Sequence, residues 1–145
     1  MLIDNNYAEQ RIVNGVSYSY DAVRKKWLSV DKYDIFYSIN HKNISASRWL
    51  VTGNGIYSNN IGLKIFNKGT IIMATLQLRN PSSCKFVVKD GYSSTILSLE
   101  LNNECDKMIE TNIDFEESVS LGCFLVIENN KVDFPFIALR YAFNL

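Results

Sequence analysis

Few residues of this chain have the types and spacing that catalysis requires. Nucleophilic catalysis needs a serine, cysteine or threonine beside a base, and the single histidine, His41, lies in a polar stretch. Asp114, Glu116 and Glu117 could supply the carboxylate pair of a glycosidase, but neighbours on one strand point to opposite faces of a sheet. We therefore interpret His41 as a surface residue and the three acids as a solvated loop, and we predict no catalytic residues and no enzyme activity.

The sequence also lacks the clustered ligands of a metal or cofactor site. Cys84, Cys105 and Cys123 are an odd, widely spaced set without a Cys-x-x-Cys pair, which predicts free thiols from a reducing compartment. Cys105 stands between two acids, and a solvated turn explains that group better than a metal. Gly53-Asn54-Gly55 is followed by no helix that could hold a phosphate, so it is interpreted as a turn. We expect neither a cofactor nor a metal.

Charge and hydropathy limit the partners. Fifteen basic and fifteen acidic residues give a formal net charge of zero, whereas nucleic-acid binding normally needs a positive face. The short run Arg24-Lys25-Lys26 is interpreted as a solvated loop edge. No segment approaches the ~18 apolar residues that would cross a bilayer, and the first six residues do not resemble a signal peptide. We expect no nucleic acid and no membrane insertion, while a neutral chain is free to self-associate.

Aromatic side chains are the remaining candidates for recognition. Tyrosine and tryptophan rings can stack on sugars, but they are also enriched in cores and subunit interfaces. We favour core or interface positions for most of these rings. The candidates for glycan or interface contacts are Tyr33, Tyr37, Trp49, Tyr57 and Tyr92.

The elements that must carry these residues are predicted to be strands. Short β-branched and aromatic runs recur between Asn, Gly, Ser and Asp turns, and no segment shows a helical period. We predict an all-β fold, an antiparallel, jelly-roll-like β-sandwich of about eight to ten strands without substantial helix. The predicted strands are 33–39, 62–66, 70–79, 84–89, 95–101, 119–128 and 134–145.

Several connections follow from turn residues. Asp90-Gly91 predicts a hairpin, and Asn129-Asn130 predicts another. Pro81 is expected to end the preceding strand in a turn over 80–83, because proline cannot donate to a ladder. Residues 102–106 are expected to form a loop. Residues 1–19 show little periodicity and are expected to form an extended N-terminal arm, before a β-sandwich domain over 20–145.

One set of segments, taken together, resembles a β-sandwich domain family of tailed-bacteriophage virion surface and fibre proteins. The similarity covers about residues 18–145, although Glu117-Ser118-Val119 stands where that family usually has Gly-Asp. The segments are Tyr20-Asp21, Arg24, Lys26-Trp27-Leu28-Ser29, Trp49-Leu50-Val51, Gly53-Asn54-Gly55, Gly62-Leu63-Lys64-Ile65, Gly69-Thr70-Ile71-Ile72, Asn112-Ile113-Asp114-Phe115-Glu116 and Pro135 to Tyr141.

The resemblance implies a non-enzymatic part of a phage particle, such as a head or tail fibre or a decoration subunit. It implies a homo-oligomer, with a trimer favoured over a dimer, that is made in the host cytoplasm and located in the virion. The arm 1–19 would dock on a capsid or tail protein, and the domain could also adhere to a host surface glycan. The alternative is a lectin-like carbohydrate-binding module.

Overall fold

The computed structural model describes residues 9–53, 63–91 and 94–145, and within these ranges every regular element is a strand. This result confirms the predicted all-β fold. The strands are β1 (Gln10–Val13), β2 (Val16–Asp21), β3 (Lys26–Ser29), β4 (Tyr33–Ser38), β5 (Arg48–Trp49), β6 (Val51–Thr52), β7 (Leu63–Ile65), β8 (Gly69–Asp90), β9 (Ser94–Phe115), β10 (Val119–Val126) and β11 (Phe136–Phe143).

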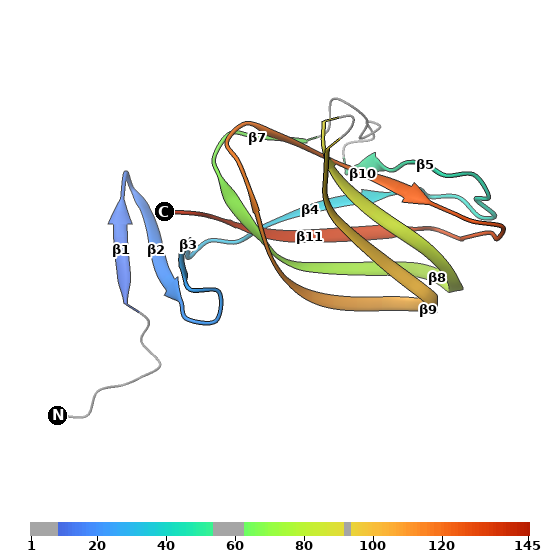
Figure 1. Ribbon diagram of the computed structural model, residues 1–145, viewed down its shortest axis with the longest axis horizontal. Helices are drawn as coiled ribbons and strands as arrows, with labels where there is room; N and C mark the ends of the chain where they lie inside the picture. The colour runs from blue at the N-terminus through green and yellow to red at the C-terminus, as the bar shows by residue number, and fades with distance from the viewer. Residues whose placement is uncertain (1–8, 54–62, 92–93) are drawn as a thin grey trace, which may run out of the picture.

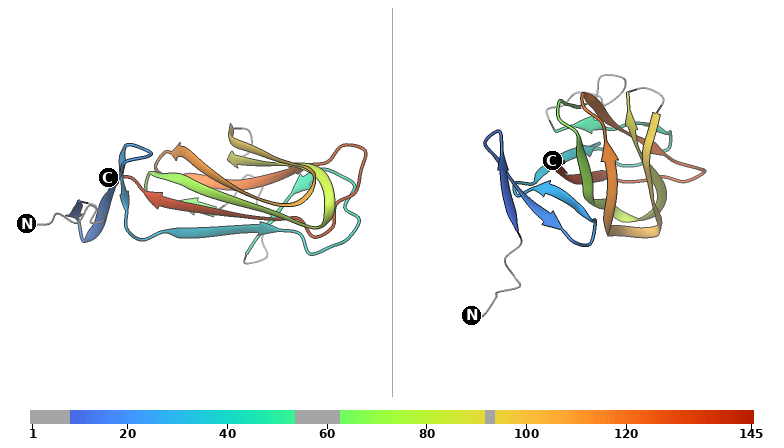
Figure 2. Two further views of the ribbon diagram at one scale, coloured as in Figure 1. Left: turned by 90° about the horizontal axis from the view of Figure 1, so that it is seen from below. Right: turned by 60° about the vertical axis from the view of Figure 1, so that its left-hand side comes forward.

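The body of the molecule is one antiparallel sheet of eight strands that folds over on itself. Its order is β5-β10-β8-β11-β4-β6, with β7 added to β10 and β9 added to β8. The first half of β8 pairs with β11 and its second half with β10, so β8 belongs to both layers. Figures 1 and 2 show β8 and β9 turning back together to form a sandwich.

The two 22-residue strands correct the prediction of a turn at 80–83 and a loop at 102–106. Both segments remain within β8 and β9, and the pairing register shifts between Gln77 and Ser82 and again before Cys84. Pro81 lies inside this irregularity, where a missing N–H breaks no regular ladder bond. The proline therefore bends the strand pair instead of ending it.

The core lies between the two layers and follows the predicted alternation. Ala74 and Leu76 of β8 and Ile137 and Leu139 of β11 are fully buried, as the period-two pattern requires. Tyr37 of β4 is also fully buried, and its hydroxyl donates a 2.6 Å hydrogen bond to the Leu121 carbonyl of β10. This bond joins one layer to the other through the core.

The hairpin predictions have two outcomes. Strands β8 and β9 pair across Asp90-Gly91, with Lys89 opposite Thr95, so that hairpin is confirmed. The Asn129-Asn130 hairpin is wrong, because β10 and β11 do not pair with each other but pair with different halves of β8. The connection from β10 to β11 therefore crosses between the layers.

A separate three-stranded sheet, β1-β2-β3, stands at one end of the body, beside the C-terminus (Figure 1). Residues 10–19 were expected to be irregular, but they form β1 and most of β2, so the expected boundary at residue 20 falls inside β2. Asn14 and Gly15 connect the strands with φ of 51° and 77°. Positive φ at both central residues is typical of the two-residue type I′ hairpin turn.

Candidate functional site

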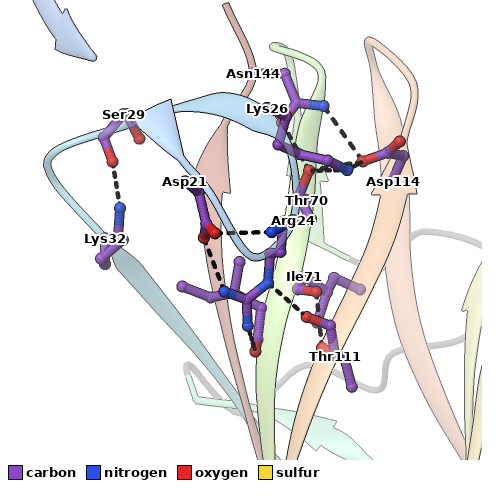
Figure 3. Close-up of polar contacts among 11 residues, drawn as sticks. Asp21, Arg24, Lys26, Ser29, Lys32, Thr70, Ile71, Thr111, Asp114 and Asn144 are labelled. Atoms are coloured by element: carbon purple, nitrogen blue, oxygen red, sulfur yellow. Dashed lines mark hydrogen bonds and ion pairs between the residues drawn. The ribbon is translucent and has the colours of Figure 1, made fainter. Parts of the chain in front are cut away.

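Arg24 fixes the β2–β3 connection to the body (Figure 3). Its Nε donates to the Thr111 carbonyl and its Nη2 to the Ile72 carbonyl, both at 2.9 Å. The pairing of β8 with β9 shifts register between Ile71 and Met73, so Ile72 lies outside the regular ladder. The planar guanidinium can bridge such divergent acceptors. Arg24 is therefore an anchor, with a side chain only 16% exposed, and not the solvated loop residue expected from the sequence.

Asp21 completes this anchor. Its carboxylate accepts a 2.9 Å hydrogen bond from the Arg24 backbone N–H and another from Arg24 Nη1. Burial raises the pKa of Asp21, but the Arg24 hydrogen bonds and charge outweigh this effect and hold the pKa below its ordinary value. Asp21 is therefore ionised near neutral pH and balances the guanidinium charge.

A second polar group joins the small sheet to β8, β9 and the C-terminal segment. Lys26 Nζ donates to Asp114 Oδ1 at 2.6 Å, and Thr70 Oγ1 lies 2.6 Å from the same oxygen and 2.7 Å from Asn144 Oδ1. Burial raises the pKa of Asp114, but the bonds from Lys26 and Thr70 prevail and lower it. Asp114, a candidate glycosidase acid in the sequence, is thus part of a structural ion pair (Figure 3).

An apolar seam lies beside these polar contacts. Leu28 of β3 packs with Ile72 of β8 and Ala142 of β11 in a small core separate from the main one. Ser29 is fully buried, and its hydroxyl oxygen accepts a 2.9 Å hydrogen bond from the Phe143 N–H. The small sheet is therefore attached to the body by both burial and directional bonds.

The face of the small sheet opposite to Leu28 carries aromatic and basic side chains. Tyr20 and Trp27 contact each other edge to face with ring centroids 5.5 Å apart, and the Arg11 guanidinium lies 4.2 Å from the Trp27 ring centroid. Cations over aromatic faces are attracted by the ring quadrupole. This contact positions Arg11 on β1, while its charge stays exposed.

The three described aromatic residues that were predicted for recognition, Tyr33, Tyr37 and Trp49, do not form one cluster. Tyr33 is 36% exposed and stacks on Tyr141 of β11, whereas Trp49 is half-buried against Phe124 of β10. Tyr37 is buried and cannot present its ring to a glycan. Tyr57 and Tyr92 lie outside the described residues.

The other candidate residues are also separate. His41 is exposed, and its carbonyl accepts a hydrogen bond from the Phe134 N–H. Cys84 and Cys123 are buried free thiols, and burial raises the pKa of Cys84 to about 12. In the part of the chain that the structure describes, no group of three or more His, Cys, Asp or Glu could hold a metal ion. No helix there is long and apolar enough to cross a membrane.

The class of fold is thus an antiparallel β-sandwich with a small N-terminal sheet at one end. The fold is similar to that of PRD1 vertex protein P5, with a TM-score of 0.50. The match covers 93% of this chain and 86% of that protein at 13% sequence identity, so the similarity concerns the fold. Neither a protein-family model nor a curated protein sequence matches the chain.

Proposed function

We propose that this chain is a structural protein of a bacteriophage particle that acts by assembly and not by catalysis. The observation that carries the proposal is the fold shared along nearly the whole chain with a phage vertex protein. The way polar residues are used is compatible with it, because Asp21, Arg24, Lys26 and Asp114 stabilise the junction between two sheets.

The test is the composition of purified particles of the virus that encodes the chain. Mass spectrometry across a density gradient should find the protein in the particle fractions at a constant ratio to the major capsid protein. Antibody labelling in electron micrographs would then distinguish head from tail. Recovery only from the soluble fraction of infected cells would contradict the proposal.

The proposal includes attachment through the N-terminal residues 1–19 to a capsid or tail protein. Because residues 10–19 belong to the small sheet, two deletions separate attachment from folding. Deleting residues 1–9 leaves the strands intact, and deleting 1–17 removes β1 and part of β2. Loss of particle attachment with both deletions supports this docking role, while attachment that persists after deletion of 1–17 would eliminate it.

Glycan binding, the alternative function, has little support from the aromatic side chains. Tyr37 is buried, and Tyr33 and Trp49 already pack against rings of β11 and β10. We therefore propose adhesion to a host glycan only as a second property of a structural particle protein. A glycan array with the protein and its Tyr33→Ala and Trp49→Ala variants measures it directly.

A further inference from the structure

Strands β1 and β9 each have an open edge. Strand β1 pairs only with β2, and strand β9 pairs only with β8. Within the described residues, the opposite side of each strand has no strand partner. Such edges present unpaired N–H and C=O groups that can accept another strand.

The two edges carry opposite charge. Residues 10–29 contain four basic residues against Asp21, and Arg11 and Lys25 remain outside the junction ion pairs. Strand β9 contains five acidic residues against Lys107, which pairs with Glu104 at 3.4 Å. Complementary charge of this kind steers association and fixes register.

Exposed apolar side chains lie at the same two places. Ile12 of β1 is 76% exposed, and Met108 of β9 is 69% exposed. Natural edge strands usually avoid such side chains, because they favour pairing with another chain. Their presence on both β1 and β9 makes these two edges candidates for pairing with another chain.

We propose that β1 of one copy adds antiparallel to β9 of a second copy of this chain. One register gives one ion pair and two apolar contacts: Arg11 faces Glu110, Ile12 faces Ile109, and Val13 faces Met108. Facing residues of an antiparallel pair lie on the same side of the sheet, so the ion pair and the Val13–Met108 contact share one side. Gln10 faces Thr111, whose carbonyl already accepts a hydrogen bond from Arg24 Nε. The added ladder therefore ends at this pair.

This contact is head to tail, because it joins two different surfaces of the chain. Repetition of such a contact closes into a ring when the rotation allows it, and a ring of three would be the trimer. The inference rests on the proposed structural role, but it concerns the isolated protein. Particle composition tests the role, and self-association in solution tests the interface, so failure of one is distinguishable from failure of the other.

The experiment measures self-association of the full chain by light scattering and sedimentation equilibrium. Arg11→Glu and Glu110→Arg should each weaken association by about tenfold or more, because each places like charges opposite one another. The double variant restores the pair with reversed sign, and its association should return close to that of the unmodified protein. Lys25→Glu and Glu100→Arg make the same charge changes outside the proposed register, and they should have much smaller effects.

Cross-linking provides a measurement that does not depend on charge. In a Cys105→Ser background, Val13→Cys and Met108→Cys together should form an intermolecular disulfide when a copper–phenanthroline oxidant removes the two thiol electrons. Either cysteine alone should not form this bond. A wild-type protein that stays monomeric at millimolar concentration would overturn the inference. The inference would also be overturned if neither Arg11→Glu nor Glu110→Arg weakened association, or if the double variant did not recover it.

Discussion

At the scale of single residues, Arg24 shows how one side chain can hold two sheets together. Its guanidinium satisfies carbonyls of β8 and β9 at an irregular point of their ladder and also pairs with Asp21. A buried carbonyl that loses its hydrogen-bond donor destabilises the folded state, because water cannot fully replace the lost bond. Arg24 therefore stabilises the junction through the acceptors it satisfies more than through its charge.

Arg24→Ala should lower the free energy of unfolding by about 2 kcal/mol, because two carbonyls and one carboxylate lose their partner. Arg24→Lys should recover only part of this loss, since one ammonium group cannot reproduce the planar fork. Urea unfolding measures both changes, and hydrogen exchange of the β3 amides locates them. Lys25→Ala, at the exposed neighbouring position, should change stability by less than about 0.5 kcal/mol. Equal losses at positions 24 and 25 would contradict the anchoring role.

Asp21 should make stability depend on acidic pH. Its pKa is lower in the folded chain than its ordinary value of 3.8, so the unfolded chain binds more protons in acid. The stabilisation is thus present above that value and is lost as the pH falls through the folded-state pKa. Asp21→Asn should reduce the slope of unfolding free energy against pH below about pH 4. Glu116→Gln serves as the control, and an unchanged slope in Asp21→Asn would refute the assignment.

At the scale of elements, alternation of apolar residues predicted the central strands but not their continuity. The pattern of Ala74, Leu76 and Leu78 identifies the buried face of β8 because successive side chains alternate across a sheet. Pro81 predicts the end of that strand, because proline lacks the N–H that a ladder needs. The sequence alone does not show that this proline lies at a bulge, where the missing N–H is tolerated. The bend depends on pairing of β8 with β9, a tertiary feature without a local signature.

The small sheet and its junction were less predictable for different reasons. The Asn14-Gly15 pair is a local hairpin signal that could have identified β1 and β2. The role of Arg24 had no such signal, because its acceptors lie 48 and 87 residues away in the chain. A contact of that separation is set by the fold and not by neighbouring residues.

Gly69 tests the close packing at the start of β8. A Cβ at this position would lie 2.5 Å from the Ala142 carbonyl oxygen and 2.5 Å from Phe115 Cζ. Gly69→Ala should therefore lower the free energy of unfolding by about 2 kcal/mol, as expected for an overpacked interior. Gly53→Ala is the matched control, because no described atom lies within 4 Å of its added Cβ, and it should cost less than about 0.5 kcal/mol. Thermal and urea unfolding of the two variants measure the difference, and equal stability would show that β11 and Phe115 can move aside.

At the scale of the whole molecule, the two outer strands of the small sheet, β1 and β3, differ in how much of their surface is buried. Strand β1 is exposed along its length and, among the described strands, pairs only with β2, whereas Leu28 of β3 is buried against β8 and β11. Stability and assembly should therefore depend on different parts of the N-terminal region. Under the proposed interface, β1 would contact other chains, whereas β3 stabilises the fold.

Two truncations distinguish these roles. Deleting residues 1–13 removes β1 and should change the free energy of unfolding by less than about 1 kcal/mol, since it exposes little buried surface. Deleting residues 1–29 also removes Arg24 and Leu28, and it should cost about 4 kcal/mol from lost apolar burial and unsatisfied carbonyls. Urea unfolding measures both, and light scattering on the same samples should show that the shorter deletion already abolishes self-association. A shorter deletion as destabilising as the longer one would mean that β1 supports the body, and self-association that survives it would place the interface elsewhere.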